Sequence, residues 1–266
     1  MGQDNAIPWY EEYFGPDYLL IDSHTRTAEE VAFLCDVLDL RAGTSLLDAG
    51  CGYGRHLVPL AMRGVDVVGC DFSGFMLAEA VRHIDNEAAD RSRSANRLRK
   101  WAHEGPRLVQ CDTRELPFDH AFDCACNLFN SFGYFEEERD NFLMLTEIAG
   151  SLKPGGLFLL EHVNRDFVLQ AHTRKDWFEH DGAYILEKKW FDPNRNRSEI
   201  DVTVIDKAGA RHYHHSIRLY SNTEITLLLE AAGFRILEIL GGFGGEEYDL
   251  STDKMIVLAQ ALPEVT

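Results

Sequence analysis

The fold is decided by residues 46–54, which read Leu46-Leu47-Asp48-Ala49-Gly50-Cys51-Gly52-Tyr53-Gly54. This apolar run stops in a turn with glycine at every second position. A second apolar run that ends in an acid, Val67-Val68-Gly69-Cys70-Asp71, follows it. The pattern predicts a buried parallel strand, a tight turn beside a ligand, a helix, and a second strand whose terminal carboxylate accepts both hydroxyls of a ribose. The stretch therefore predicts a nucleoside-binding half-site.

The glycine spacing and one acid narrow the kind of nucleoside. Residues 50–54 have the spacing GxGxG, whereas dinucleotide-binding turns have GxGxxG. Asp48 precedes the first glycine, where its carboxylate would attract the cationic group of an amino acid and repel a pyrophosphate. We therefore expect a nucleoside ligand without phosphates.

Helix-like and strand-like segments alternate along the rest of the chain. Apolar residues at helical spacing predict helices at residues 27–40, 73–84 (with a polar extension to about residue 104), 141–152 and 221–233. Apolar runs predict further strands at residues 107–111, 123–128, 157–163 (after a turn at 153–156), 235–240 and 254–261. Between residues 184 and 220, three strand-like runs separated by turn signals predict an antiparallel meander. This order predicts an α/β fold with a doubly wound, mostly parallel seven-stranded sheet and an antiparallel β insert after strand 5.

These changes of rhythm divide the chain into three parts. We expect residues 1–40 to form an N-terminal segment with a helix, residues 41–165 and 221–262 the core that binds the nucleoside, and residues 166–220 an antiparallel insert. With 266 residues, 45% of them hydrophobic, the chain is long enough for one α/β domain with such an elaboration.

The net charge and the cysteines limit which binding partners and which cellular compartment we expect. A formal net charge of -18 at pH 7 disfavours nucleic acid and polyanionic substrates, because binders of phosphate backbones concentrate basic residues. No signal pattern opens the chain, and no apolar run reaches membrane-spanning length, so we expect no membrane partner. Most of the six cysteines lie in apolar runs, as expected for a reduced, cytoplasmic protein. The histidines at 212, 214 and 215 lack a completing ligand pattern, so no metal is expected.

At residues 47–54 and Asp71 the chain resembles the class I S-adenosylmethionine-dependent methyltransferases, whose first motif is similar to the glycine turn and whose second motif ends in an acid. The resemblance implies a Rossmann-like methyltransferase fold, S-adenosylmethionine as cofactor and S-adenosylhomocysteine as its product. The antiparallel insert is similar to that of the small-molecule branch, which includes N-methyltransferases that act on amino sugars, glycine and antibiotic precursors. In the similar enzymes the N-terminal segment covers the cofactor, so the resemblance implies an N-terminal lid and helix at residues 1–40, a cofactor-binding core at 41–165 and 221–262, and a substrate-side insert at 166–220. It covers nearly the whole chain and is diffuse outside the cofactor motifs.

The resemblance also implies which residues contact the cofactor. Asp112 and Thr113 follow the third strand, where the family uses an acid to bind the adenine amino group. Phe72 and Met76 are expected to cover the adenine, and Arg26 to meet the cofactor's carboxylate. The expected cofactor-binding residues are Arg26, Asp48, Gly50, Cys51, Gly52, Asp71, Phe72, Met76, Cys111, Asp112, Thr113, Asn127 and Leu128.

Aromatic residues surround the expected acceptor pocket, and aromatic faces suit a sulfonium donor and an amine acceptor. They are Trp9, Tyr10, Tyr13, Phe14, Tyr18, Phe129, Phe132, Tyr134 and Phe135. Methyl transfer needs mainly alignment and desolvation, and an amine must also lose a proton, for which His162, Glu161 or Tyr220 are candidates. In the similar enzymes tyrosines of the N-terminal segment lie over the active site, which implies this role for Tyr10 and Tyr18. The expected catalytic residues are Tyr10, Tyr18, Phe129 and His162, and the expected substrate-binding residues are Asn130, Phe132, Tyr220 and Arg218.

The sequence leaves several functions open. We expect methyl transfer to a small-molecule acceptor, with nitrogen preferred over oxygen. An O-methyltransferase of a phenolic or sugar hydroxyl and a non-catalytic regulatory module that binds the cofactor are the alternatives. A modifier of RNA or protein would need an open, charged docking surface. The insert would serve equally as a substrate roof or as the interface of a homo-oligomer.

Overall fold

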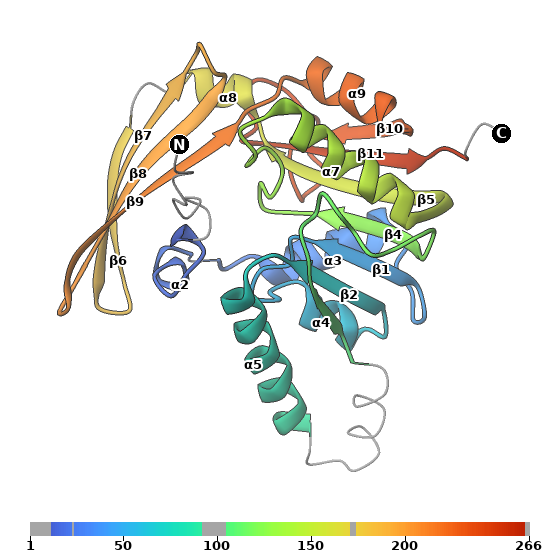
Figure 1. The fold of residues 1–266 in the computed structure, drawn as a ribbon, viewed down its shortest axis with the longest axis horizontal. Helices are drawn as coiled ribbons and strands as arrows, with labels where there is room; N and C mark the ends of the chain where they lie inside the picture. Colours follow the sequence, from blue (N-terminus) through green and yellow to red (C-terminus); the bar gives the residue numbers. More distant parts are fainter. Residues whose placement is uncertain (1–11, 23, 92–104, 171–173, 264–266) are drawn as a thin grey trace, which may run out of the picture.

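The structure is a computed structural model that describes residues 12–22, 24–91, 105–170 and 174–263, whose strands form two sheets (Figure 1). The larger sheet has seven strands in the order β10-β11-β5-β4-β1-β2-β3. They are β1 (Ser45–Ala49), β2 (Asp66–Asp71), β3 (Arg107–Gln110), β4 (Phe122–Asn127), β5 (Leu152–Val163), β10 (Phe234–Leu240) and β11 (Lys254–Ala261). Strands β1 to β5 pair in parallel, and β11 runs antiparallel to both of its neighbours. The predicted doubly wound, mostly parallel sheet is confirmed.

Helices cover both faces of this sheet, which explains the apolar runs of its strands. They are α3 (Thr27–Val37), α4 (Leu57–Met62), α5 (Gly74–Arg91), α7 (Glu138–Ser151) and α9 (Asn222–Ala231). Successive strand residues point to opposite faces. Leu46 therefore packs with residues of α3, α4 and α5, whereas Leu47 packs with residues of α7 and α9. A strand that is buried on both faces needs consecutive apolar residues.

Three predicted boundaries differ in the structure. The first predicted helix, 27–40, ends at Val37, and the second continues to Arg91. Residues 92–104 of its polar extension lie outside the described residues. The turn predicted at 153–156 lies inside β5, where the pairing with β4 shifts register between Phe122 and Cys124. The turn residues are therefore accommodated as an irregularity in a longer strand.

The insert is a four-stranded antiparallel sheet in the order β6-β7-β8-β9, one strand more than predicted. It consists of β6 (Arg174–His180), β7 (Ala183–Asp192), β8 (Arg197–Asp206) and β9 (Gly209–Arg218), and α8 (Arg165–Gln170) leads into it. The missed strand, β6, is rich in charged residues and has a Trp177 that is 65% exposed, so it lacks the apolar run of a buried strand. Within the described ranges no helix has the length and apolar character required to cross a membrane.

The N-terminal segment packs on the insert and joins it to the core. Tyr13 is buried in a cluster with Ile185 of β7 and Val204 of β8, and the short helix α2 (Tyr18–Ile21) follows it. In Figure 1, α2 lies between the antiparallel sheet and the carboxyl ends of β1 and β2. The segment thereby covers the edge of the parallel sheet where ligands of doubly wound folds bind.

Candidate functional site

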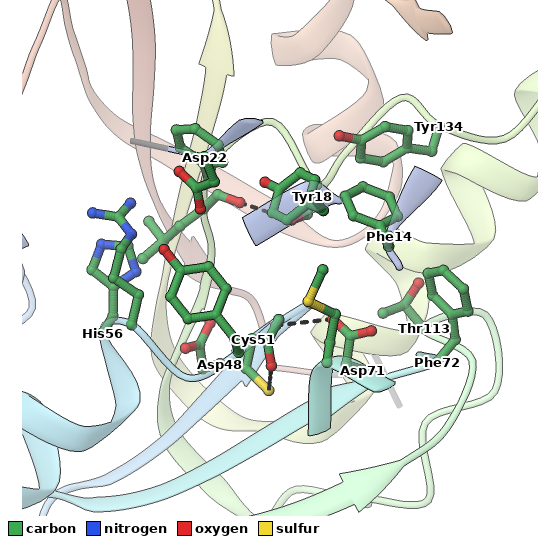
Figure 2. A pocket seen from close by; sticks show the side chains of 18 of the residues that line it. Phe14, Tyr18, Asp22, Asp48, Cys51, His56, Asp71, Phe72, Thr113 and Tyr134 are labelled. Carbon is green, nitrogen blue, oxygen red and sulfur yellow. Dashed lines mark hydrogen bonds between the residues drawn. The ribbon is translucent and has the colours of Figure 1, made fainter. Parts of the chain in front are cut away.

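A cavity of about 290 Å³ lies beside the carboxyl ends of β1 and β2 and the segments that follow β3 and β4. The N-terminal segment contributes Phe14, Tyr18 and Asp22 to its wall (Figure 2). Ten of the thirteen residues expected to bind the cofactor line it: Asp48, Gly50, Cys51, Gly52, Asp71, Phe72, Met76, Asp112, Thr113 and Leu128. Of the residues expected to be catalytic, Tyr18 and Phe129 line it as well.

The glycine turn after β1 is held by backbone hydrogen bonds to the end of β2. The amides of Gly50 and Cys51 donate to the carbonyl of Cys70 at 2.8 and 2.9 Å. Gly50 has φ +81°, and a Cβ at this position would lie 3.0 Å from the Cβ of Ser131. Glycine is therefore required both by the backbone conformation and by the close approach of the segment after β4.

Asp71, at the end of β2, presents a buried carboxylate to the cavity. Its Oδ2 accepts a hydrogen bond from the Gly52 amide at 2.9 Å, and its Oδ1 accepts one from the Ser73 amide at 2.8 Å. Burial raises the pKa of Asp71 to about 6, although hydrogen bonds from the amides of Ser73, Gly52 and Phe72 oppose this shift. The carboxylate lines the cavity and has acceptor capacity beyond these amides, so it can accept a hydrogen bond from a ligand.

Asp112 is the second carboxylate that reaches the cavity from a strand end. Arg114 donates to it from its backbone amide at 2.9 Å and from its guanidinium at 2.7 Å, and also pairs with Asp140 at 2.6 Å. These hydrogen bonds lower the pKa of Asp112. The guanidinium of Arg114 also lies 4.4 Å from the ring centre of Phe135, a lining residue. Asp112 is thus ionised and fixed in position at neutral pH.

A charged group that the sequence analysis missed lies behind Asp48. Arg55 and His56 line the cavity and both contact the buried carboxylate of Glu30 on α3, His56 at 2.8 Å. Burial would raise the pKa of Glu30, but the hydrogen bond from His56 and the charge of Arg55 outweigh it and bring the pKa to about 2. Asp48 is 2% exposed, and its pKa is raised by burial. The sequence did offer a signal, since Arg55-His56 directly follows the glycine turn.

Aromatic side chains close the cavity on the side of the insert. Phe14 packs against Tyr18, Phe72 and Tyr134, with ring centres 5.0, 6.2 and 5.5 Å apart. Burial raises the pKa values of Tyr18 and Tyr134 well above the ordinary value, so both hydroxyls stay protonated. Tyr10, also expected to be catalytic, lies outside the described residues.

The chain leaves β4 through two residues in the left-handed region, Phe129 at φ 58° and Asn130 at φ 57°. The Phe129 amide donates to Glu161 Oε2 at 2.7 Å, which stabilises this uncommon conformation. Phe129 lines the cavity. Asn130, which was expected to bind the substrate, is not among the lining residues. Glu161 is itself 1% exposed and paired with Lys254, so it is a structural anchor.

Four of the residues expected at the site, His162, Phe132, Tyr220 and Arg218, lie outside the lining of the cavity. His162 is fully buried, its Nε2 accepts the Tyr220 amide at 3.3 Å, and burial lowers its pKa to about 3. The rings of Phe132 and Tyr220 lie 5.1 Å apart. Arg218 lies 4.3 Å from the Tyr220 ring centre and pairs with Glu138 and Glu224. None of the four lines the cavity.

Three predicted cofactor contacts are also absent from the lining. Arg26 is exposed at the start of α3, and Arg55 is the arginine that lines the cavity instead. Asn127 is fully buried and donates from Nδ2 to the Ala49 carbonyl at 2.6 Å, which ties β4 to the glycine turn. Cys111 follows β3 and donates its amide to the Asp71 carbonyl. Asn127 and Cys111 therefore hold the strand ends that carry the lining residues, without lining the cavity themselves.

Comparison with known proteins places the chain among methyltransferases. Residues 46–156 match the family model described as "Methyltransferase domain". A glycine/sarcosine N-methyltransferase from Aphanothece halophytica is 31% identical over 226 residues, which cover 84% of this chain and 78% of that protein. An N,N-dimethyltransferase of dTDP-3-amino-3,4,6-trideoxy-alpha-D-glucopyranose from Streptomyces venezuelae is 25% identical, with 82% and 87% covered. The chain spans about half the length of other curated relatives, such as rat glycine N-methyltransferase (30% identical, 56% and 50% covered).

The fold agrees with this placement. A solved S-adenosylmethionine-dependent methyltransferase from Clostridium acetobutylicum superposes with a TM-score of 0.77 at 18% identity, covering 96% of this chain and 99% of that one. The match to a relative above 30% identity, which covers most of both chains, agrees with the glycine turn and Asp71 at the cavity. The chain belongs to the class I S-adenosylmethionine-dependent methyltransferases of the small-molecule branch.

Proposed function

We propose that this protein transfers a methyl group from S-adenosylmethionine to an amine nitrogen of a small molecule. The observation that carries the proposal is the cavity itself, which joins a buried carboxylate at the end of β2, a glycine turn and an aromatic wall. When bound, the cofactor supplies an electrophilic methyl group on a sulfonium. The residues around the cavity fit such a ligand chemically.

The strand ends supply the groups that a nucleoside needs. Asp71 would accept hydrogen bonds from the ribose hydroxyls, because its carboxylate is fixed by backbone amides and lines the cavity. Asp112, held ionised by Arg114, would accept a hydrogen bond from the adenine amino group. Thr113 and Phe72 lie beside it in the wall of the cavity. Gly50 leaves room where a side chain would collide with Ser131.

Charged groups of both signs would hold the amino-acid end of the cofactor. Asp48 and Arg55 line the same part of the cavity, and they match an ammonium and a carboxylate group respectively. Arg55 is kept in place by Glu30 and by the ring of Phe129, which lies 5.4 Å from its guanidinium. We assign the cofactor's carboxylate to Arg55, in place of Arg26.

The aromatic wall would favour a cationic donor and an amine acceptor. Tyr18, Phe129 and Tyr134 exclude water, and ring faces attract cations. Holding the two reactants in line in such a site can remove a large share of the barrier. Two relatives have names that specify glycine or sarcosine and an amino sugar as acceptors, which supports nitrogen over oxygen.

The proposal is tested in two steps. Calorimetric titration should show saturable binding of S-adenosylmethionine and S-adenosylhomocysteine and no binding of NAD. Incubation with labelled cofactor and matched panels of amines, phenols and sugars, read by mass spectrometry, should then label amines. Labelled hydroxyls would favour O-methylation, and binding without any product would favour a regulatory module. A cytoplasmic location and a homo-oligomeric state stay predictions.

A further inference from the structure

Asp22 is a cavity-lining carboxylate that the assignments above do not use. It follows α2, and its amide donates to the Tyr18 carbonyl at 2.8 Å, which fixes the turn. Its side chain is only 3% exposed, and it contacts the imidazole of His24. A buried carboxylate is costly unless a cation or hydrogen-bond donors face it. Because Asp22 lines the cavity, a cationic ligand could bind to its carboxylate there.

The position of Asp22 separates it from the nucleoside end of the cavity. In Figure 2, Asp22 and His56 lie on one side of the cavity, and Phe72 and Thr113 lie on the other. Asp22 comes from the N-terminal segment, whereas Asp48 and Asp71 come from the strand ends. It thus approaches the end of the cavity that lies away from the proposed adenine contacts.

The groups that face Asp22 leave its negative charge uncompensated by any fixed lysine or arginine that contacts it in the described part of the chain. Its charge, together with burial, raises the pKa values of Tyr13, Tyr18 and Tyr53, so these hydroxyls remain neutral. Arg55 is engaged by Glu30. The ring of His24 lies edge-on to Phe129 at 4.1 Å, so the acid, the imidazole and the aromatic wall form one surface.

We propose that Asp22 binds the ammonium group of the acceptor and accepts the proton that this nitrogen must lose before it can take the methyl group, which makes a primary or secondary amine the substrate class of this site. This inference rests on the proposed methyltransferase function. Neutral phenols and sugar hydroxyls would gain no charge attraction from Asp22, whose contacts within the protein are with His24 and Tyr53. The acid would therefore select for amines over hydroxyl acceptors of similar shape.

Sinefungin gives a test that does not require the acceptor to be known. It is an S-adenosylmethionine analogue in which an amine-bearing carbon replaces the methylated sulfur, so it carries an ammonium group where the methyl group is transferred. S-adenosylhomocysteine lacks that group but keeps the amino-acid end. We expect Asp22→Asn to weaken sinefungin binding at least tenfold in calorimetric titration and to leave S-adenosylhomocysteine binding within twofold.

The controls separate the alternatives. Asp36→Asn removes an equal charge from an exposed position on α3 and should change neither affinity. Asp22→Glu keeps the charge and should recover part of the sinefungin affinity. An equal loss for both ligands would mean that Asp22 holds the cofactor's own amino group or the fold, and no loss for either would leave it without a ligand; both results overturn the inference. If wild-type protein binds neither ligand, the proposed function itself fails.

Discussion

The two halves of the cavity are held together by different kinds of interaction. On the core side, backbone amides and strand ends define the site: Gly50 and Cys51 bond to the Cys70 carbonyl, and Asp71 is fixed by two amides. On the insert side, side chains from distant parts of the sequence do this work. The first half follows from local backbone geometry, whereas the second depends on contacts that single substitutions can remove.

Arg197 shows how the insert side is built. This arginine, at the start of β8, is 3% exposed, and its guanidinium donates to the carbonyls of Tyr134 and Phe135 and to Ser216 Oγ, the last at 2.7 Å. Tyr134 and Phe135 line the cavity, so the insert fixes that wall through their backbone. His215 of β9 adds a 3.2 Å hydrogen bond to the Tyr134 hydroxyl.

The N-terminal segment is attached to the same sheet. Tyr13 stacks on His215 with ring centres 4.8 Å apart and an interplanar angle of 4°. Asp17 accepts hydrogen bonds from Arg211 and from the Tyr213 hydroxyl, the latter at 2.7 Å. The N-terminal segment that carries Tyr18 therefore packs on the insert. Loss of these contacts would expose the cavity and leave the strand ends of the core unchanged.

The largest expected effect breaks the core half. Asp71→Ala should weaken S-adenosylhomocysteine binding about a thousandfold, because two hydrogen bonds to a charged group contribute about 2 kcal/mol each. Calorimetric titration measures this directly. Asp66→Ala, at the other end of the same strand, removes an exposed ion pair with Arg107 and should have little effect. A similar loss in both variants would show that Asp71 acts through the stability of β2.

The next effect tests the insert half. Arg197→Met should lower the free energy of unfolding by about 3 kcal/mol, because several buried carbonyls lose their donor. Urea denaturation provides the measurement. Arg197→Lys should recover only part of the loss, since a lysine cannot reach the same acceptors with a planar fork. Arg195→Met, two residues away and half exposed, is the matched control, and an equal loss there would contradict the special role of Arg197.

The same contrast explains what could be predicted from the sequence. The parallel sheet was predictable because burial on both faces requires continuous apolar runs, and the glycine turn because few other residues adopt its backbone conformation. Asp71 and Asp112 followed, since strand ends fix their place at one edge of the sheet. Strand β6 was missed because its outer face carries exposed Trp177 among charged residues.

The missed and misplaced site residues depend on tertiary contacts. Asp22 reaches the cavity only when the N-terminal segment folds over the glycine turn, and the pairing of Arg55 with Glu30 joins two residues 25 positions apart, a contact that no periodicity in the sequence predicts. His162 was expected at the site because it lies near the end of a strand. The structure shows that Tyr220, from the segment after the insert, covers it instead. Position along a strand therefore predicted a lining residue only where the strand end faces the cavity, and the segment after the insert separates His162 from it.

A smaller effect is the pH dependence of S-adenosylhomocysteine binding, which tests whether the ionised form of Asp71 binds the ligand. Its pKa of about 6 means that the carboxylate is ionised at pH 7 and becomes protonated as the pH falls to 5. A protonated acid is a poorer acceptor for two hydroxyls, so S-adenosylhomocysteine affinity should fall about tenfold between pH 7 and 5. Asp71→Asn should bind weakly with little pH dependence over this range. A pH dependence that survives in this variant would assign the titration to another group.

The linked effect on stability has the opposite sign. The pKa of Asp71 in the folded protein lies above its ordinary value of 3.8, so the folded state binds this proton more tightly than the unfolded chain. The contribution of this group to stability therefore rises as the pH falls through 6 and levels off below about 4. Thermal unfolding of wild type and Asp71→Asn between pH 7 and 5 measures the difference.

The smallest expected effect on binding is at His162, which belongs to neither half of the cavity. His162→Gln keeps an acceptor for the Tyr220 amide and should leave S-adenosylhomocysteine affinity and its pH dependence within twofold of wild type. His162→Phe removes that acceptor and should lower the free energy of unfolding by about 1–3 kcal/mol with equally little change in affinity. A pH profile of binding or turnover that changes in the Gln variant would restore His162 as a proton relay. An unchanged profile would mean that His162 has a structural role, as the hydrogen-bond acceptor that connects β5 to the segment after the insert. The groups that act on the ligands would then lie at the strand ends and in the N-terminal segment.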